Sequence, residues 1–272
     1  MNLSNYSVLP FYDDKDEQLS RRTYAYGEVY PLYVEKGKVP PFQFVVRSNG
    51  NSIQSALLVN YNNGTAQTIT HISGTFLKKE FSGYDVFICR GVTLGGVNMT
   101  VGRWYLQMNV AGSSSLETIY SEVFTAVDDV SPYTKVQWWD DQDLVVKDER
   151  IVYDIGSGLN FKNVVYLDCQ IGMPDYDFEE EGETRDGLYF PEKMISVKTH
   201  KFTFLAPEYL LDAMRFIRMS DNMVVTDRDG RVYTADTFLL TPKWQAPGML
   251  AAVDAEFKTS AVAKKIGRDY SD

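Results

Sequence analysis

Between residues 42 and 127, apolar and polar residues alternate in short stretches separated by turn residues. The first stretch alternates Phe42, Phe44 and Val46 with Gln43, Val45 and Arg47. A period of two is typical of a strand with one buried face, and Asn62-Asn63-Gly64 is a strong turn signal. Roughly seven such strands in about 85 residues predict an immunoglobulin-like β-sandwich over residues 40–130. Only this architecture is implied, because the Cys-Trp-Cys core of antibody domains is absent from the sequence.

The second half of the chain combines strand-like segments, such as Asn163–Leu167, with one segment of helical periodicity. From Pro207 to Met219, apolar residues recur at the spacing of one helix face: Leu210, Ala213, Met214 and Ile217. Residues 131–272 are therefore predicted to form an α+β domain with one main helix packed on a β-sheet, in a mainly β chain. Leu211 and Phe216 lie beside this stripe, so we expect them to contact the flank of the domain or a neighbouring subunit.

Residues 1–39 lack a clear period and are rich in aromatic residues and prolines. The aromatic residues are Tyr6, Phe11, Tyr12, Tyr24, Tyr26, Tyr30 and Tyr33. We predict an extended arm that packs on its own domain or on a neighbouring subunit, because tyrosine combines a large contact area with a polar tip. Deletion of residues 1–33 is expected to impair assembly and to leave both domains folded.

The charge of the chain is concentrated in one segment. The formal net charge is −10, which argues against a general nucleic-acid role because phosphate binding needs a basic surface. Residues 175–186 hold seven carboxylates: Asp175, Asp177, Glu179, Glu180, Glu181, Glu183 and Asp186. We predict an acidic loop that faces solvent or a basic partner. Cation binding stays open, although Glu180 and Asp186 occupy the positions where an EF-hand loop needs glycine and glutamate.

No stretch of the sequence approaches the 18 or more apolar residues that span a bilayer, so no membrane partner is expected. Residues 1–13 have neither the basic nor the apolar region of a secretory signal, which favours synthesis and folding in a cytoplasm. Cys89 and Cys169 are 80 residues apart and belong to no metal-binding or redox motif. They are predicted to be buried free thiols.

The residue patterns that could support catalysis are incomplete. His71 and His200 lie in strand-like segments without a metal-binding or acid–base spacing, so we interpret both as structural. Trp138 and Trp139 precede the acidic residues Asp140, Asp141 and Asp143, a combination that a sugar-binding platform could use. Adjacent residues of a strand point to opposite faces, so one tryptophan is expected in the core and the other at an interface.

No catalytic, cofactor-binding or metal-binding residue is therefore assigned, no cofactor is expected, and the protein is predicted not to be an enzyme. A glycosidase remains the enzymatic alternative, because its two carboxylates are defined by their separation in space, which a sequence does not give.

Several stretches resemble a group of tail-associated structural proteins of phages and prophages of Bacteroides-type gut bacteria. They are Tyr26–Leu32, Tyr120–Thr125, Val136–Asp140, Phe190–Lys193, Phe202–Ile217, and the stretch that begins with Thr241–Trp244 and ends with Lys264–Gly267. The resemblance implies a non-enzymatic virion protein of the tail tip, baseplate or collar, made in the host cytoplasm. Its partners would be other tail proteins and copies of itself, arranged as a symmetric oligomer such as a ring. A carbohydrate- or receptor-binding module for attachment to a host-surface glycan is the alternative.

Overall fold

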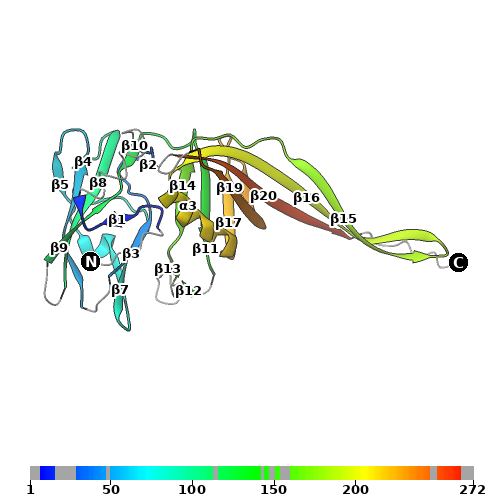
Figure 1. The fold of residues 1–272 in the computed structure, drawn as a ribbon, viewed down its shortest axis with the longest axis horizontal. Coiled ribbons are helices and arrows are strands. Elements are labelled where there is room, and N and C mark those ends of the chain that lie inside the picture. The colour runs from blue at the N-terminus through cyan, green and yellow to red at the C-terminus, as the bar shows by residue number, and fades with distance from the viewer. Residues whose placement is uncertain are drawn as a thin grey trace.

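The computed structural model describes residues 7–15, 29–46, 50–112, 116–141, 144–146, 151–153, 160–245 and 250–264. These residues form a mainly β protein with one main helix, which confirms the coarse prediction from the sequence. Figure 1 shows the N-terminal half at one end of the molecule and the C-terminal half beside it. A long strand pair projects to the opposite end.

A seven-stranded sheet is the larger layer of the N-terminal half. Its strands are β1 (Phe11–Tyr12), β2 (Tyr33–Glu35), β4 (Ser52–Asn60), β5 (Ala66–Thr68), β8 (Gly102–Ala111), β9 (Leu116–Ser121) and β10 (Phe124–Val127). The central strand β8 pairs with β4 on one side and with β9 and β10, in succession, on the other. At the margins, β5 pairs with β4, β1 with β9, and β2 in parallel with β10.

A three-stranded sheet is the smaller layer, in the order β3 (Phe42–Val46), β7 (Tyr84–Cys89) and β6 (Leu77–Phe81). The short helix α2 (Ile72–Thr75) precedes β6. Phe11 of the larger sheet contacts the smaller sheet, with its ring centroid 4.8 Å from Phe42 and 5.1 Å from Phe44. Burial of each such ring stabilises the fold by about 1.5–3 kcal/mol, so these aromatic residues hold the two layers together.

Part of the predicted N-terminal arm belongs to this core. Val8, Leu9, Phe11 and Tyr12 are at most 1% exposed, and the Glu122 N–H donates to the Pro10 carbonyl at 2.8 Å. Of the two places predicted for the arm, these residues occupy the first, their own chain, and they do so as part of the core because their side chains are buried in it. Deletion of residues 1–33 would remove that part of the core. Residues 1–6 and 16–28 of the predicted arm lie outside the described residues.

The next part of the predicted arm contacts the C-terminal half. The ring of Tyr33 stacks on Tyr133 with their centroids 4.0 Å apart. Burial, with the adjacent Tyr133, raises the pKa of Tyr33 to about 12. Tyr30 is partly buried near Cys169 and Asp168, and its desolvation is the main reason that its pKa is raised. These two tyrosines therefore connect the halves of one chain.

Two four-stranded antiparallel sheets form the C-terminal half. The first has the order β14 (Asn163–Leu167), β11 (Thr134–Trp139), β17 (Asn222–Thr226) and β18 (Val232–Thr234). The second has the order β15 (Asp175–Arg185), β16 (Leu188–Ala206), β20 (Ala251–Lys264) and β19 (Thr237–Lys243). A separate hairpin pairs β12 (Leu144–Val146) with β13 (Ile151–Tyr153).

The main helix, α3 (Glu208–Met214), continues as a 3-10 turn over Arg215–Met219. Its predicted stripe is confirmed as buried, because Leu210, Ala213, Met214 and Ile217 are each at most 3% exposed. The stripe shares one hydrophobic cluster with residues of both C-terminal sheets, such as Val225 and Val253. The helix therefore belongs to the core between these sheets.

Phe216 lies off that stripe and joins the two halves of the chain. It is 6% exposed and clusters with Val45, Val86 and Ile88 of the three-stranded sheet. The sequence left two partners open for this ring, the flank of its own domain or a neighbouring subunit. In the structure, its cluster combines these N-terminal residues with Phe161 of the C-terminal half of the same chain.

Candidate interaction surface

The acidic run that was predicted as a loop is a strand. Residues 175–185 form β15, which pairs with β16 from Asp175 opposite Thr199 to Arg185 opposite Leu188. The turn between them, Asp186-Gly187, has positive φ at both residues, as a two-residue type I′ hairpin turn requires. A strand that is exposed on its edge and on its faces can hold many hydrated carboxylates, so the high charge of this segment is compatible with a strand.

We call Asp175–Thr199 together with Thr259–Lys264 the blade. It consists of β15, the first part of β16 and the last part of β20, and Figure 1 shows it projecting from the rest of the C-terminal half. The remaining part of the same sheet, His200–Ala206 with β19 and Ala251–Lys258, is called the body of the sheet. One strand, β16, runs through both.

The face of the sheet that is buried in the body continues onto the blade. In the body, alternate residues of β16 are buried: His200, Phe202, Phe204 and Ala206. By the same alternation, Lys198 and Ser196 continue this face, and they pair with Tyr176 and Phe178 of β15. Tyr176 is 63% exposed and Phe178 is 56% exposed. The blade therefore presents two large aromatic side chains on a face that is covered in the body.

The electrostatics of β15 are dominated by its carboxylates. At its base, Lys201 Nζ lies 2.7 Å from Asp175 Oδ2, and this hydrogen bond raises the pKa of Lys201. Lys198 Nζ lies 5.5 Å from the centroid of the Tyr176 ring, and Arg185 forms an ion pair with Glu183 near the tip. These three cations stand among the seven carboxylates of residues 175–186, so the strand is an acidic edge.

The blade also exposes the edge of β20. In the body, β19 begins at Thr237 opposite Lys258, and the Asp236 N–H donates to the Lys258 carbonyl at 2.8 Å. From Thr259 to Lys264, β20 pairs with β16 on one side, and no described strand lies on the other. The outer side of β15 likewise has no partner strand among the described residues. Unpaired strand edges are templates for pairing with another chain.

A cleft of about 490 Å³ lies where the blade leaves the body. Its lining includes Tyr176, Lys198, His200, Arg228 and Tyr233. His200 is 4% exposed, and no hydrogen bond of its Nδ1 is found in the described structure. Burial and the nearby Lys198 lower the pKa of His200, so the fold favours the neutral imidazole. The ring stacks on Phe257 with a centroid distance of 4.8 Å, which fits the predicted structural role.

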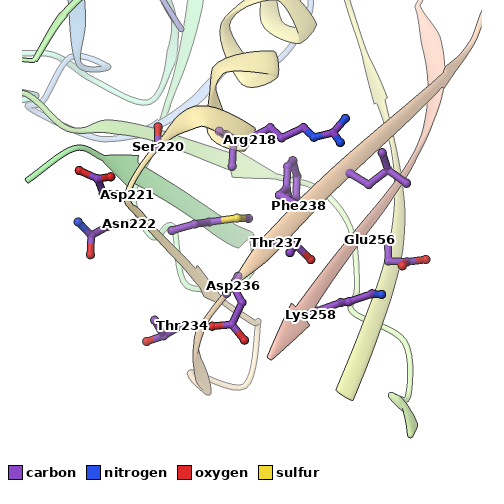
Figure 2. Close-up of a pocket in the computed structure, with 14 residues that line it drawn as sticks. Arg218, Ser220, Asp221, Asn222, Thr234, Asp236, Thr237, Phe238, Glu256 and Lys258 are labelled. Atoms are coloured by element: carbon purple, nitrogen blue, oxygen red, sulfur yellow. The ribbon is translucent and has the colours of Figure 1, made fainter. Parts of the chain in front are cut away.

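A second cleft, of about 630 Å³, opens between the sheets near β18 and β19. Figure 2 shows Asp221, Asn222, Asp236 and Glu256 around it, together with Phe238. Phe238 is the aromatic residue of this lining and is only 5% exposed. The cleft is therefore polar and has no broad aromatic platform.

The other predicted residues are distributed over the fold without forming a joint site. His71 is not in a strand, because it precedes α2 with a left-handed φ of 61° and is exposed. Cys89 and Cys169 are confirmed as free and buried, and burial raises the pKa of each thiol to about 11. Trp138 is fully buried, whereas the half-buried Trp139 has Lys162 Nζ 3.8 Å from its ring centroid.

The carboxylates near the tryptophans fix strand ends. Asp140 Oδ1 accepts the Asp221 N–H at 3.0 Å, and Asp221 Oδ2 accepts the Asp141 N–H at 3.1 Å. Burial and the neighbouring carboxylates raise the pKa of Asp140. These two hydrogen bonds join the residues that follow β11 to the residue that precedes β17. The carboxylates of Asp140 and Asp221 therefore have a structural role. Asp143 lies outside the described residues.

Within the described ranges, no group of three or more His, Cys, Asp or Glu residues gathers where it could hold a metal ion. No helix in the same part of the chain is long and apolar enough to cross a membrane. The chain matches no protein-family model, no curated protein and no solved structure.

Proposed function

We propose that this protein is a non-enzymatic structural protein of a phage tail, located at the tail tip, baseplate or collar. In this role it joins copies of itself and other tail proteins into a symmetric oligomer. The observation that carries the proposal is the blade, which exposes Tyr176 and Phe178 and two strand edges away from the body. Such a surface is costly in an isolated protein and useful in an assembly, where a partner covers it.

The strand order of the N-terminal half supports its assignment as an immunoglobulin-like sandwich. The smaller sheet has the order β3-β7-β6, and the larger sheet contains β2-β10-β8-β4-β5. In chain order, β3, β4, β6, β7 and β8 match strands B, C, D, E and F of that fold, and β9 with β10 matches G. An immunoglobulin-like unit next to an α+β unit suits a particle component that makes contacts on several sides.

The alternative, a glycan- or receptor-binding module, has less support from the geometry. Sugar recognition commonly uses an exposed aromatic ring as an apolar platform beside polar groups. The cleft near β18 and β19 has the polar groups, but its aromatic residue, Phe238, is buried. The exposed aromatic rings of the blade lie instead on a sheet face with open edges, which is a better surface for a protein partner.

Sedimentation velocity of the full chain over a range of concentrations tests the proposal. We expect species at multiples of the 31.0 kDa chain mass that become more abundant with concentration. The same samples are then applied to a panel of immobilised bacterial surface glycans. A chain that stays at 31.0 kDa at every concentration and binds a glycan would contradict the assembly role and favour the alternative.

A further inference from the structure

We propose that the open edge of β20 in the blade, Thr259–Lys264, pairs with strand β15 of a second copy of this chain. The inference rests on the proposed function and deepens it, because it names the surface through which the copies join.

The two edges lie at the same level of the blade. Residues Tyr176–Glu181 of β15 pair with Lys193–Lys198 of β16, and these same β16 residues pair with Thr259–Lys264 on the other side. Each edge is therefore six residues long, or about 20 Å at the rise of a strand. A second copy placed beside the first, without a shift along the strands, brings one edge against the other.

The charges favour this pairing over pairing of like edges. Six carboxylates lie in β15, whereas Thr259–Lys264 of β20 contains no acidic residue and has lysines at its two ends in the sequence: Lys258, Lys264 and Lys265. Two β15 strands placed side by side would bring their carboxylates together, which is unfavourable, so a symmetric contact between equal edges is opposed. The contact between β15 and β20 is head-to-tail and joins an acidic edge to an edge flanked by lysines.

The strand directions fix the geometry of the seam. Both β15 and β20 are antiparallel to β16, so they run in the same direction. Copies related by rotation about an axis along the blade keep that direction, which makes the seam a parallel pair. A row of such copies leaves an open edge at each end, and closure into a ring removes both. Tyr176 and Phe178 lie next to this seam, where same-face side chains of the added β20 strand contact them from one side.

Disulfide formation tests the seam in the full chain. The double variant Glu180→Cys, Ala263→Cys places both thiols at the level of Met194, on opposite sides of β16. Within one chain they are two strand spacings apart, about 9.6 Å, which exceeds the reach of a disulfide. Under mild oxidation we expect a ladder of covalent oligomers, and dimers alone when the two single variants are mixed. The matched control, Glu180→Cys with Thr241→Cys on β19, should give no ladder.

The outcomes separate this inference from the proposed function. If sedimentation shows oligomers but the double variant forms no ladder, the seam is wrong and the assembly role stands. Dimers formed by Glu180→Cys alone would show that equal edges meet, which also overturns the seam. If the parent chain stays monomeric at every concentration, both the seam and the assembly role are rejected.

Discussion

The body and the blade belong to one sheet, yet the same face is covered in one and exposed in the other. In the body, Phe202, Phe204 and Phe257 are at most 5% exposed. In the blade, Tyr176 and Phe178 are more than half exposed. Burial in the body contributes about 1.5–3 kcal/mol for each large apolar side chain, a gain that the blade can have only with a partner. Folding and assembly therefore use different parts of one sheet, and mutations should separate them.

The largest expected effect is on the stability of the body. Phe257→Ala removes a fully buried ring that stacks on His200, and it should lower the free energy of unfolding by about 3–5 kcal/mol. Its matched control is Phe178→Ala in the blade, which should change stability by less than about 0.5 kcal/mol and reduce oligomer formation. Urea unfolding of both variants measures the difference. Equal losses of stability would show that the blade is part of the folding core.

The next effect concerns the contact between the halves. Phe216→Ala should cost about 3 kcal/mol, because the ring is buried against Val45, Val86 and Ile88 of the N-terminal half. We expect the variant to unfold in two separate transitions in calorimetry, since the halves lose part of their coupling. The control Leu211→Ala, at the half-buried flank of the same helix, should keep a single transition. A loss of assembly with unchanged unfolding would instead assign Phe216 to a contact between subunits.

A smaller effect is expected from the charges of the blade. Asp177→Lys with Glu180→Lys should weaken self-association roughly tenfold, equivalent to about 1.4 kcal/mol, because lysines would then face the lysine-flanked edge of β20. Addition of Lys264→Glu should restore part of the loss. Sedimentation at low and high salt measures both effects, which should shrink as salt screens the charges. An association constant that is unaffected by both the lysine substitutions and the Lys264→Glu substitution would contradict the head-to-tail contact.

The smallest effect is a pH dependence of the body. The folded state lowers the pKa of His200 below its unfolded value near 6.5, so between these values the unfolded chain binds more protons. The stability contributed by the neutral ring is therefore present above pH 6.5 and declines as the pH falls below it. His200→Phe keeps a ring against Phe257 and should flatten this decline, measured as melting temperature between pH 7 and pH 5. An unchanged pH profile would show that His200 does not titrate on unfolding.

The parts of the fold that were predicted correctly have local signals. The helix stripe at Leu210–Ile217 and the burial of one of the two adjacent tryptophans follow from periodicity, and the structure shows the stripe and Trp138 buried. The turn at Asn62–Gly64 follows from residue preference and does connect β4 to β5. Such features depend on neighbouring residues within one element, so a single sequence contains the information that predicts them.

Seven carboxylates in twelve residues favour a solvated loop, yet the segment is a strand and its turn. A signal for the hairpin was present in the Asp186-Gly187 turn, together with the alternation of Tyr176 and Phe178 with Asp177. The parallel pairing of β2 with β10, and the contact of Phe216 with the N-terminal half, have no local signal. Both join residues far apart in the chain, and their geometry is set by tertiary packing. The open edge of β20 was missed for the same reason, since it depends on where β19 begins.

Hydrogen exchange of the blade amides, followed as the chain concentration rises, tests the account most directly. We expect backbone amides on the outer edges of Tyr176–Glu181 and Thr259–Lys264 to become protected as oligomers form, because pairing with another copy gives them acceptors. Amides of the body, such as those of β19, should keep the same protection at all concentrations. Oligomers that form while the blade edges continue to exchange as fast as in the monomer would contradict the account.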